Sequence, residues 1–192
     1  MRIARSIVSL LLLLLGSCKS PQPEIKRAEA GKTGPAIERP LFEWHGDGVA
    51  GPVSVVISVS EQKAYIFRGG KEVGWTYVAT GKPSHPSPRG SFQVLEKLRI
   101  KKSNRYGTIV DASGATIDSD ATAGREAIPP GGRFVGASMP WWMRITSWGV
   151  GMHAGPIPHP GSPASHGCIR LPPEMARTLF SIVKIGTPVS IR

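Results

Sequence analysis

The sequence predicts a mainly β domain, arranged as a sandwich or meander of mixed strands with one or two short helices. Several short runs rich in β-branched residues, which are typical of strands, follow one another from Val53 onward. The chain also holds 23 Gly and 18 Pro, which indicates many turns and few long helices. A length of 192 residues fits one domain of medium size with additional segments.

Four strands are predicted in the first half of this domain. Residues 53–59 alternate partly between apolar and polar side chains, and residues 64–67 follow after a short polar break. Residues 68–71 supply the turn chemistry of a hairpin before a third strand at residues 72–80. A proline-rich segment separates this strand from the fourth, at residues 91–98. Short strands in succession favour an antiparallel meander or a sandwich.

The second half of the domain is expected to contain an insertion, a strand, a helix and a closing strand. Residues 103–138 are rich in Gly, Ser, Asp and Ala with little periodicity, so we expect a loop insertion there. A strand then delivers His153 near its end. Residues 174–183, preceded by two prolines, have the pattern of a helix, and residues 187–191 that of the last strand. The predicted domain spans residues 51–192.

The chain is strongly basic, with 24 Lys and Arg against 13 Asp and Glu. A positive field of this size favours polyanions, which include nucleic acids, anionic lipid head groups and anionic cell-wall polymers. Charge alone does not choose among these partners. The N-terminal segment does, because it predicts export and therefore argues against a nucleic-acid partner.

Residues 1–17 are predicted to be a signal peptide. Two arginines precede an apolar run at residues 7–15, which is about half of the ~20 residues that a membrane-spanning helix needs. Residues 15–18 (Leu-Gly-Ser-Cys) resemble the lipobox of bacterial lipoproteins, in which the cysteine becomes lipid-modified. The resemblance implies lipidation of Cys18. Ordinary secretory cleavage, which would leave Cys18 free to pair with Cys168, is the alternative.

Residues 18–50 are predicted to form a flexible linker between the lipid anchor and the domain. They contain several prolines and charges of both signs without a sustained apolar period. The expected protein is therefore exported and membrane-anchored, and it faces the periplasm or the cell wall. Lys19 after the lipidated cysteine favours the outer membrane in a host that has two membranes.

The reactive side chains are concentrated in one short segment rich in Gly and Pro. It holds three of the five histidines, His153, His159 and His166, together with Ser165 and Cys168. A thiol with the ordinary pKa of about 8.5 is mostly protonated at neutral pH, so a nucleophilic cysteine needs a neighbouring base or cation. Histidine is the usual base. The cluster therefore predicts a cysteine nucleophile served by a histidine.

Two short strings in this segment resemble a known family. Residues 165–168 (Ser-His-Gly-Cys), with residues 151–153 (Gly-Met-His) upstream, resemble the signature of the bacterial L,D-transpeptidase (YkuD-type) catalytic domain. The resemblance extends over residues 53–192. It implies a β-rich fold with the catalytic cysteine loop near the C-terminus, no cofactor, and peptidoglycan stem peptides as the substrate. Ala154, the Ser-Pro-Arg-Gly segment at residues 87–90 and the long insertion depart from the family pattern.

The resemblance also implies roles for individual residues. Cys168 is the nucleophile that forms a thioester with the stem peptide, and His153 is its proton acceptor and donor. The backbone N–H groups of Gly167 and Cys168 are suited to holding the oxyanion, because main-chain donors need no side-chain ordering. The other polar residues of the motif are expected to support the loop, the thiolate or substrate binding: Ser165, His166 and Arg170.

Several readings of the function remain open from the sequence. The resemblance implies release of D-alanine and transfer of the acyl group to an amine of a second stem or of a protein. Water as the acceptor would instead make an L,D-carboxypeptidase or endopeptidase. A zinc site built from the clustered histidines and Cys168, and a non-catalytic cell-wall-binding lipoprotein, are alternatives of other classes. Carbapenem-type β-lactams are expected to acylate Cys168.

Overall fold

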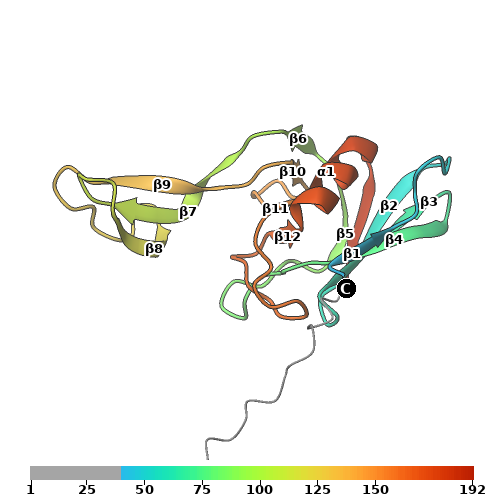
Figure 1. Cartoon of the computed structure of the whole chain (residues 1–192), viewed down its shortest axis with the longest axis horizontal. Coiled ribbons are helices and arrows are strands. Elements are labelled where there is room, and N and C mark those ends of the chain that lie inside the picture. The colour runs from blue at the N-terminus through green and yellow to red at the C-terminus, as the bar shows by residue number, and fades with distance from the viewer. Residues whose placement is uncertain (1–39) are drawn as a thin grey trace, which may run out of the picture. The chain divides into compact units, whose positions relative to one another are not determined.

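A computed structural model of the chain describes residues 40–192. The predicted signal peptide, Cys18 and the linker up to residue 39 lie outside the described residues. The described part consists of three β-sheets and one helix, which Figure 1 shows in chain order. This architecture confirms the predicted mainly β class.

A six-stranded sheet contains the antiparallel meander that the sequence predicts, with the last strand of the chain added alongside it. That last strand runs parallel to its meander neighbour, so the sheet is mixed. In spatial order the strands are β1 (Phe42–Trp44), β4 (Lys71–Tyr77), β3 (Lys63–Arg68), β2 (Val53–Ser58), β13 (Pro188–Ile191) and β5 (Gly90–Gln93). β1 falls within the predicted linker, so the sheet begins before the expected boundary at residue 51.

A four-stranded sheet carries the predicted reactive residues. In spatial order its strands are β12 (Ile169–Leu171), β11 (Gly151–Ala154), β10 (Trp142–Arg144) and β6 (Glu96–Leu98). β11 and β12 are parallel, whereas the other pairs are antiparallel. The strand expected at His153 is confirmed as β11. The single strand predicted at residues 91–98 is wrong, because β5 and β6 belong to different sheets.

One hydrophobic cluster joins the two larger sheets to the helix. It includes Ile57 and Ile66 of the six-stranded sheet, and Met152 and Ile169 of the four-stranded sheet, each with no exposed surface. Full burial of such a side chain stabilises the fold by about 1.5–3 kcal/mol relative to leaving it in water. The cluster therefore holds the strand that carries His153 in a fixed place.

The helix, α1 (Pro173–Ile182), begins where the two prolines predict, because proline fits the first turn of a helix. It buries Met175, Ala176 and Leu179, which lie on one face at helical spacing. No helical segment in residues 40–192 has the length and apolar character needed to cross a membrane.

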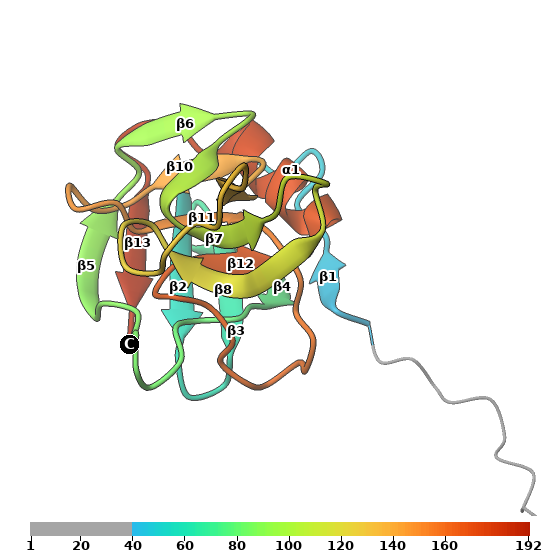
Figure 2. The ribbon, with the colours of Figure 1, turned by 90° about the vertical axis from the view of Figure 1, so that its left-hand side faces the viewer.

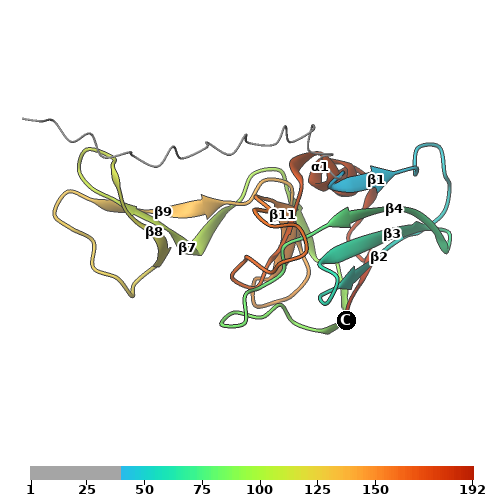
Figure 3. The same cartoon turned by 60° about the horizontal axis from the view of Figure 1, so that its bottom comes forward.

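The insertion forms a three-stranded antiparallel sheet, so the prediction of a loop at residues 103–138 is wrong. β7 (Lys102–Val110) is its central strand, between β8 (Thr116–Thr122) and β9 (Arg133–Ser138). Most of its side chains are at least partly exposed, so the apolar alternation of a half-buried strand is missing from the sequence. Figures 1 and 3 show β11 between this added sheet and the six-stranded sheet, and in Figure 2 the added sheet lies in front of β11 and β12.

Candidate active site

The parallel pairing of β11 and β12 brings Cys168 and His153 to one face of the four-stranded sheet. His153 stands opposite Arg170, and Cys168 comes directly before β12. Side chains alternate between faces along a strand, so Cys168 and Arg170 point to the same face as His153. Gly151, at the start of β11, donates its backbone N–H to the Cys168 sulfur. The two predicted catalytic residues therefore share one site.

His153 is a buried, neutral base. Its side chain is 5% exposed, and Nδ1 lies 2.8 Å from the carbonyl oxygen of Ala154. A carbonyl only accepts hydrogen bonds, so Nδ1 carries the proton and Nε2 keeps a free lone pair. Burial lowers the pKa of His153 to about 4; the Ala154 contact opposes this effect and the charge of Arg170 adds to it. The ring is therefore uncharged at neutral pH and ready to accept a proton.

Cys168 is held as a neutral thiol. Burial raises its pKa, while the Gly151 N–H and the charge of Arg170 oppose that effect. A raised thiol pKa and a lowered imidazole pKa both disfavour a resting thiolate–imidazolium pair. No hydrogen bond joins the His153 ring to the thiol in the described structure. Proton transfer to His153 is therefore expected to accompany attack on a substrate, when the catalytic hydrogen bonds tighten.

The burial of His153 predicts a stability that depends on pH. Between about pH 6.5 and 4 the unfolded chain binds a proton at this histidine while the folded protein does not, so acid favours unfolding. We expect this residue to lower the free energy of unfolding by about 2 kcal/mol between pH 7 and 5. Urea unfolding at several pH values measures the effect, and His153→Asn, which cannot titrate, is the control. An equal loss in both proteins would contradict the prediction.

Ser165 closes the loop that carries Cys168. Its hydroxyl accepts the Gly167 N–H at 3.0 Å and donates to the Cys168 carbonyl oxygen. Gly167 has a φ of 107°, in the left-handed region that other residues rarely enter. These contacts are those of a loop-supporting residue. The sequence predicts that the N–H groups of Gly167 and Cys168 hold the oxyanion. In this structure the Gly167 N–H donates to Ser165, so its role toward an oxyanion stays a prediction.

The segment after β4 supports the same loop, a role that the sequence does not predict for it. Ser87 donates to the Gly167 carbonyl oxygen at 2.8 Å and accepts the Gly81 N–H at 2.9 Å. A Cβ on Gly81 would overlap the His85 carbonyl oxygen and lie 2.9 Å from the Gly167 Cα, so only glycine fits there. No local sequence pattern could link Ser87 and Gly81 to this loop, because Ser87 lies 80 residues from Gly167 in the chain.

Arg170 is a half-buried cation on the face of the thiol. Burial lowers its pKa, whereas Cys168, when it is ionised, and the charge of Asp120 raise it. Within residues 40–192 its guanidinium forms no ion pair with a carboxylate. An arginine in this state is suited to bidentate binding of a substrate carboxylate. Loop support and substrate binding both stay predictions for Arg170.

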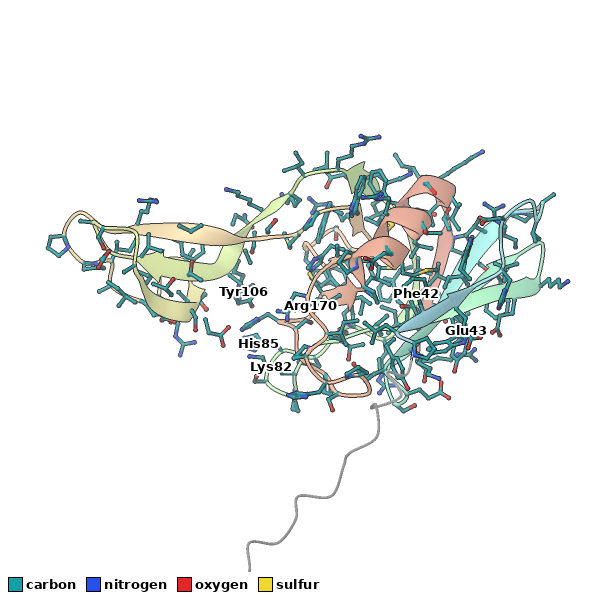
Figure 4. All side chains as sticks on the ribbon, viewed as in Figure 1. Phe42, Glu43, Lys82, His85, Tyr106 and Arg170 are labelled. Atoms are coloured by element: carbon teal, nitrogen blue, oxygen red, sulfur yellow. The ribbon has the colours of Figure 1, made fainter. Side chains whose placement is uncertain are left out.

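The added sheet contacts the loop that carries Cys168, at His166. Nε2 of His166 lies 3.1 Å from a carboxylate oxygen of Asp120 on β8, and its ring stacks on Tyr106 of β7 with 4.5 Å between centroids. Asp120 also pairs with Lys82 at 3.3 Å. The His85 ring lies 4.9 Å from that of His166. Figure 4 shows Tyr106, His85 and Lys82 where the added sheet meets the rest of the domain.

Asp120→Asn tests how this contact acts on His166. Burial lowers the pKa of His166 and the charge of Asp120 raises it, so the variant is expected to titrate at lower pH. The Asp120 side chain is 61% exposed, so the expected loss of unfolding free energy is only about 0–1 kcal/mol. NMR titration of the His166 ring measures the pKa, with Asp118→Asn on the same strand as the control. A pKa that stays constant or rises in Asp120→Asn would disprove the assigned contact.

His159 of the predicted cluster and two nearby tryptophans differ in their placement. His159 is exposed in the loop that follows β11. Trp142 is buried, and its ring lies 6.1 Å from that of His153, whereas Trp148 is 69% exposed. In the part of the chain that the structure describes, no group of three or more His, Cys, Asp or Glu side chains is arranged to hold a metal ion.

Comparisons with known proteins agree with this geometry. Residues 52–191 match the family described as L,D-transpeptidase catalytic domain (YkuD). The chain is 34% identical over 124 residues to probable L,D-transpeptidase 3 of Mycobacterium tuberculosis, covering 63% of this chain and 40% of that protein. It is 31% identical over 151 residues to L,D-transpeptidase 1 of the same organism, covering 76% and 51%. The chain thus spans about half the length of these curated relatives, or less.

A solved structure gives the same result for the fold. It is an L,D-transpeptidase in complex with imipenem, with a TM-score of 0.55 and 26% sequence identity to this chain. The match covers 73% of this chain and 58% of that one. The family match at residues 52–191 includes the loop that carries the candidate site.

Proposed function

Because the chain belongs to the L,D-transpeptidase (YkuD) catalytic-domain family, we propose that it is an L,D-transpeptidase acting on the peptide stems of peptidoglycan. Cys168 forms a thioester acyl-enzyme, D-alanine leaves, and an amine accepts the acyl group. The enzyme needs no cofactor for this chemistry. Its product is a cross-link between stems or a protein attached to the wall, which serves cell-wall biogenesis and cell shape.

The observation that carries the proposal is that Cys168 shares a sheet face with a buried, neutral histidine. Nδ1 of His153 is engaged by the Ala154 carbonyl oxygen, so the lone pair of Nε2 is available. Gly151 donates its N–H to the sulfur from the neighbouring strand. A nucleophile, a base and a group that orients the base are the parts that covalent acyl transfer requires.

The proposed reaction has two steps, acylation of Cys168 and transfer of the acyl group to an amine. Nε2 of His153 accepts the thiol proton as the sulfur attacks the carbonyl carbon of the L-centre, and main-chain N–H groups stabilise the oxyanion. The C–N bond to D-alanine then breaks, and His153 returns the proton to the leaving amine. In the second step an acceptor amine attacks the thioester, His153 takes a proton from that amine, and Cys168 leaves and regains a proton.

The surroundings of the thiol favour an amine over water as the acceptor. Cys168 is partly buried, and the added sheet contacts the loop at His166, two residues away. A site that excludes bulk water protects an acyl-enzyme from hydrolysis until an acceptor binds. Hydrolysis, which defines an L,D-carboxypeptidase or endopeptidase, is the second candidate, because Cys168 is only partly buried and His153 could deprotonate a water molecule as well as an amine.

Carbapenem-type β-lactams are proposed as inhibitors that acylate the same thiol. Their strained carbonyl offers Cys168 an electrophile whose leaving nitrogen stays attached, so the adduct persists. The imipenem complex of a related L,D-transpeptidase supports this proposal.

Product analysis with a tetrapeptide-stem muropeptide tests the function. The purified protein is incubated with the muropeptide alone, and with a lysine-containing peptide as a second amine. Release of D-alanine with a dimer or a lysine adduct supports transpeptidation, whereas release with only the tripeptide product supports the carboxypeptidase. Absence of both D-alanine release and an acyl-enzyme mass would favour a non-catalytic wall-binding lipoprotein.

We also propose that the protein is exported and anchored by a lipid on Cys18, facing the periplasm or cell wall, with the outer membrane as the site in a host with two membranes. The support is the leader at residues 1–17 and the Leu-Gly-Ser-Cys string. Incorporation of labelled fatty acid and recovery in the membrane fraction test it. Cys18→Ala should lose both, and a variant that keeps the label would show that Cys18 is not the lipidated residue.

A further inference from the structure

The four-stranded sheet has a recess on the face opposite Cys168, where cationic side chains surround the indole ring of Trp141. It is an open recess with a volume of about 450 Å³. Its lining consists of Lys97, Arg99, Trp141, Arg177, Phe180 and Ser181. Three of these six residues are cationic, and none is acidic.

The recess and the thiol lie on opposite faces. Trp142 and Glu96 join through a hydrogen bond of 3.0 Å, and the Trp142 ring neighbours that of His153, so this side of β6 and β10 belongs to the catalytic face. Lys97 follows Glu96 on β6, so its side chain points to the opposite face of the sheet. There its Nζ donates to the carbonyl oxygen of Val183, the residue after α1, at 2.7 Å. The recess is therefore separate from the catalytic site.

The cations of the recess contact aromatic rings rather than carboxylates, and two of them, Arg99 and Arg177, are exposed to solvent. The guanidinium carbons of Arg99 and Arg177 each lie 5.7 Å from the centroid of the Trp141 ring, and Lys97 Nζ lies 4.5 Å from that of Phe180. None of the three cations has an ion pair within residues 40–192. Burial also lowers the pKa of Lys97. An anion in the recess would offset the repulsion among three like charges.

Trp141 itself is held in an unusual backbone conformation. Its φ is 58°, in the left-handed region that a bulky side chain rarely adopts. Its N–H donates to the Arg99 carbonyl oxygen at 3.0 Å, and its ring packs on Phe180 with 5.4 Å between centroids. Strained residues persist where the surroundings over-determine them, which occurs often at ligand sites.

We propose that this recess is a second binding site, which takes a phosphate oxyanion. Two guanidinium groups present paired N–H donors that match phosphate oxygens, and an ammonium supplies a third charge. A phosphate suits three cations better than a single carboxylate does, because it carries more oxygens and more charge. The phosphate comes either from a phospholipid head group or from a free small molecule.

Titration of the full chain tests the proposal, with the indole N–H signal of Trp141 followed by NMR. The probes are inorganic phosphate and vesicles of phosphatidylcholine with and without phosphatidylglycerol. A saturable shift with inorganic phosphate supports a free oxyanion, and saturable binding only to vesicles with phosphatidylglycerol supports the head group. No shift and no vesicle binding would overturn the proposal.

A pair of double variants separates this site from the general positive field. Arg99→Gln with Arg177→Gln is expected to weaken binding by about tenfold or more, since each removes a bidentate donor. Arg125→Gln with Arg133→Gln removes the same charge from two positions that are also exposed, in the connection between β8 and β9 and at the start of β9, and is expected to change binding by less than about twofold. Equal losses in both double variants would overturn the proposal. Thermal unfolding confirms that each variant is folded.

Discussion

Cys168→Ala is expected to abolish both the covalent imipenem adduct and the release of D-alanine. Cys168 is the free cysteine of the described residues, and no other side chain on its face of the sheet can form a thioester. Intact-mass spectrometry measures the adduct, and peptide mapping separates Cys168 from Cys18. Loss of the sulfur removes the covalent route entirely, so the effect is complete rather than graded.

Cys18→Ala is the matched control for this experiment. It removes the other cysteine of the chain and should leave the adduct at Cys168 unchanged. Thermal unfolding of both variants shows that the domain is intact. An adduct or D-alanine release that survives in Cys168→Ala would mean that the nucleophile has been misassigned.

His153→Ala is expected to slow acylation of Cys168 by about 10²–10⁴-fold, the usual contribution of a positioned general base. Burial lowers the pKa of His153 and raises that of the thiol, so the wild-type pair is neutral at rest and needs the base during attack. Single-turnover acylation by imipenem measures the rate. His159→Ala, in an exposed loop, is the control and should change the rate little.

The pH dependence of the wild type distinguishes this mechanism from a preformed ion pair. The acylation rate should vary little between about pH 5 and 8 and should fall near pH 4, where His153 gains a proton. Thiolate absorbance should be absent at about pH 6, because burial raises the thiol pKa. Clear thiolate absorbance there, lost in His153→Ala, would show that the ion pair forms before substrate binds.

Local patterns were sufficient to predict much of the six-stranded sheet and the nucleophile. The meander formed by β2, β3 and β4 has strong strand sequences and a short hairpin turn, so neighbours in sequence are neighbours in space. The helix start at Pro173 also rests on a local rule. The Ser-His-Gly-Cys string that ends at Cys168 is contiguous, so it can be recognised in the sequence without knowledge of the fold.

The added sheet could not be predicted in this way. Its strands bury few side chains, so the period that reports a half-buried strand is weak, and its pairing depends on backbone hydrogen bonds that any sequence can make. The contact of Asp120 with His166 joins strand β8 to a loop far along the chain. No motif predicts such a contact, because the two residues meet only after both sheets form.

The amino-acid sequence was thus enough to predict the fold class, the family and a nucleophile, because each prediction depends on residues close together in the chain. The structure and the comparisons confirm the fold class and the family, and the nucleophile stays a prediction. Tertiary structure alone decided the neutral state of His153, the support that Ser87 and Gly81 give to the cysteine loop, and the cationic recess on the opposite face of the sheet. These features arise from burial and from pairing between distant segments. Both appear only when the chain has folded, since a pKa or a close approach is a property of the surroundings and not of the residue.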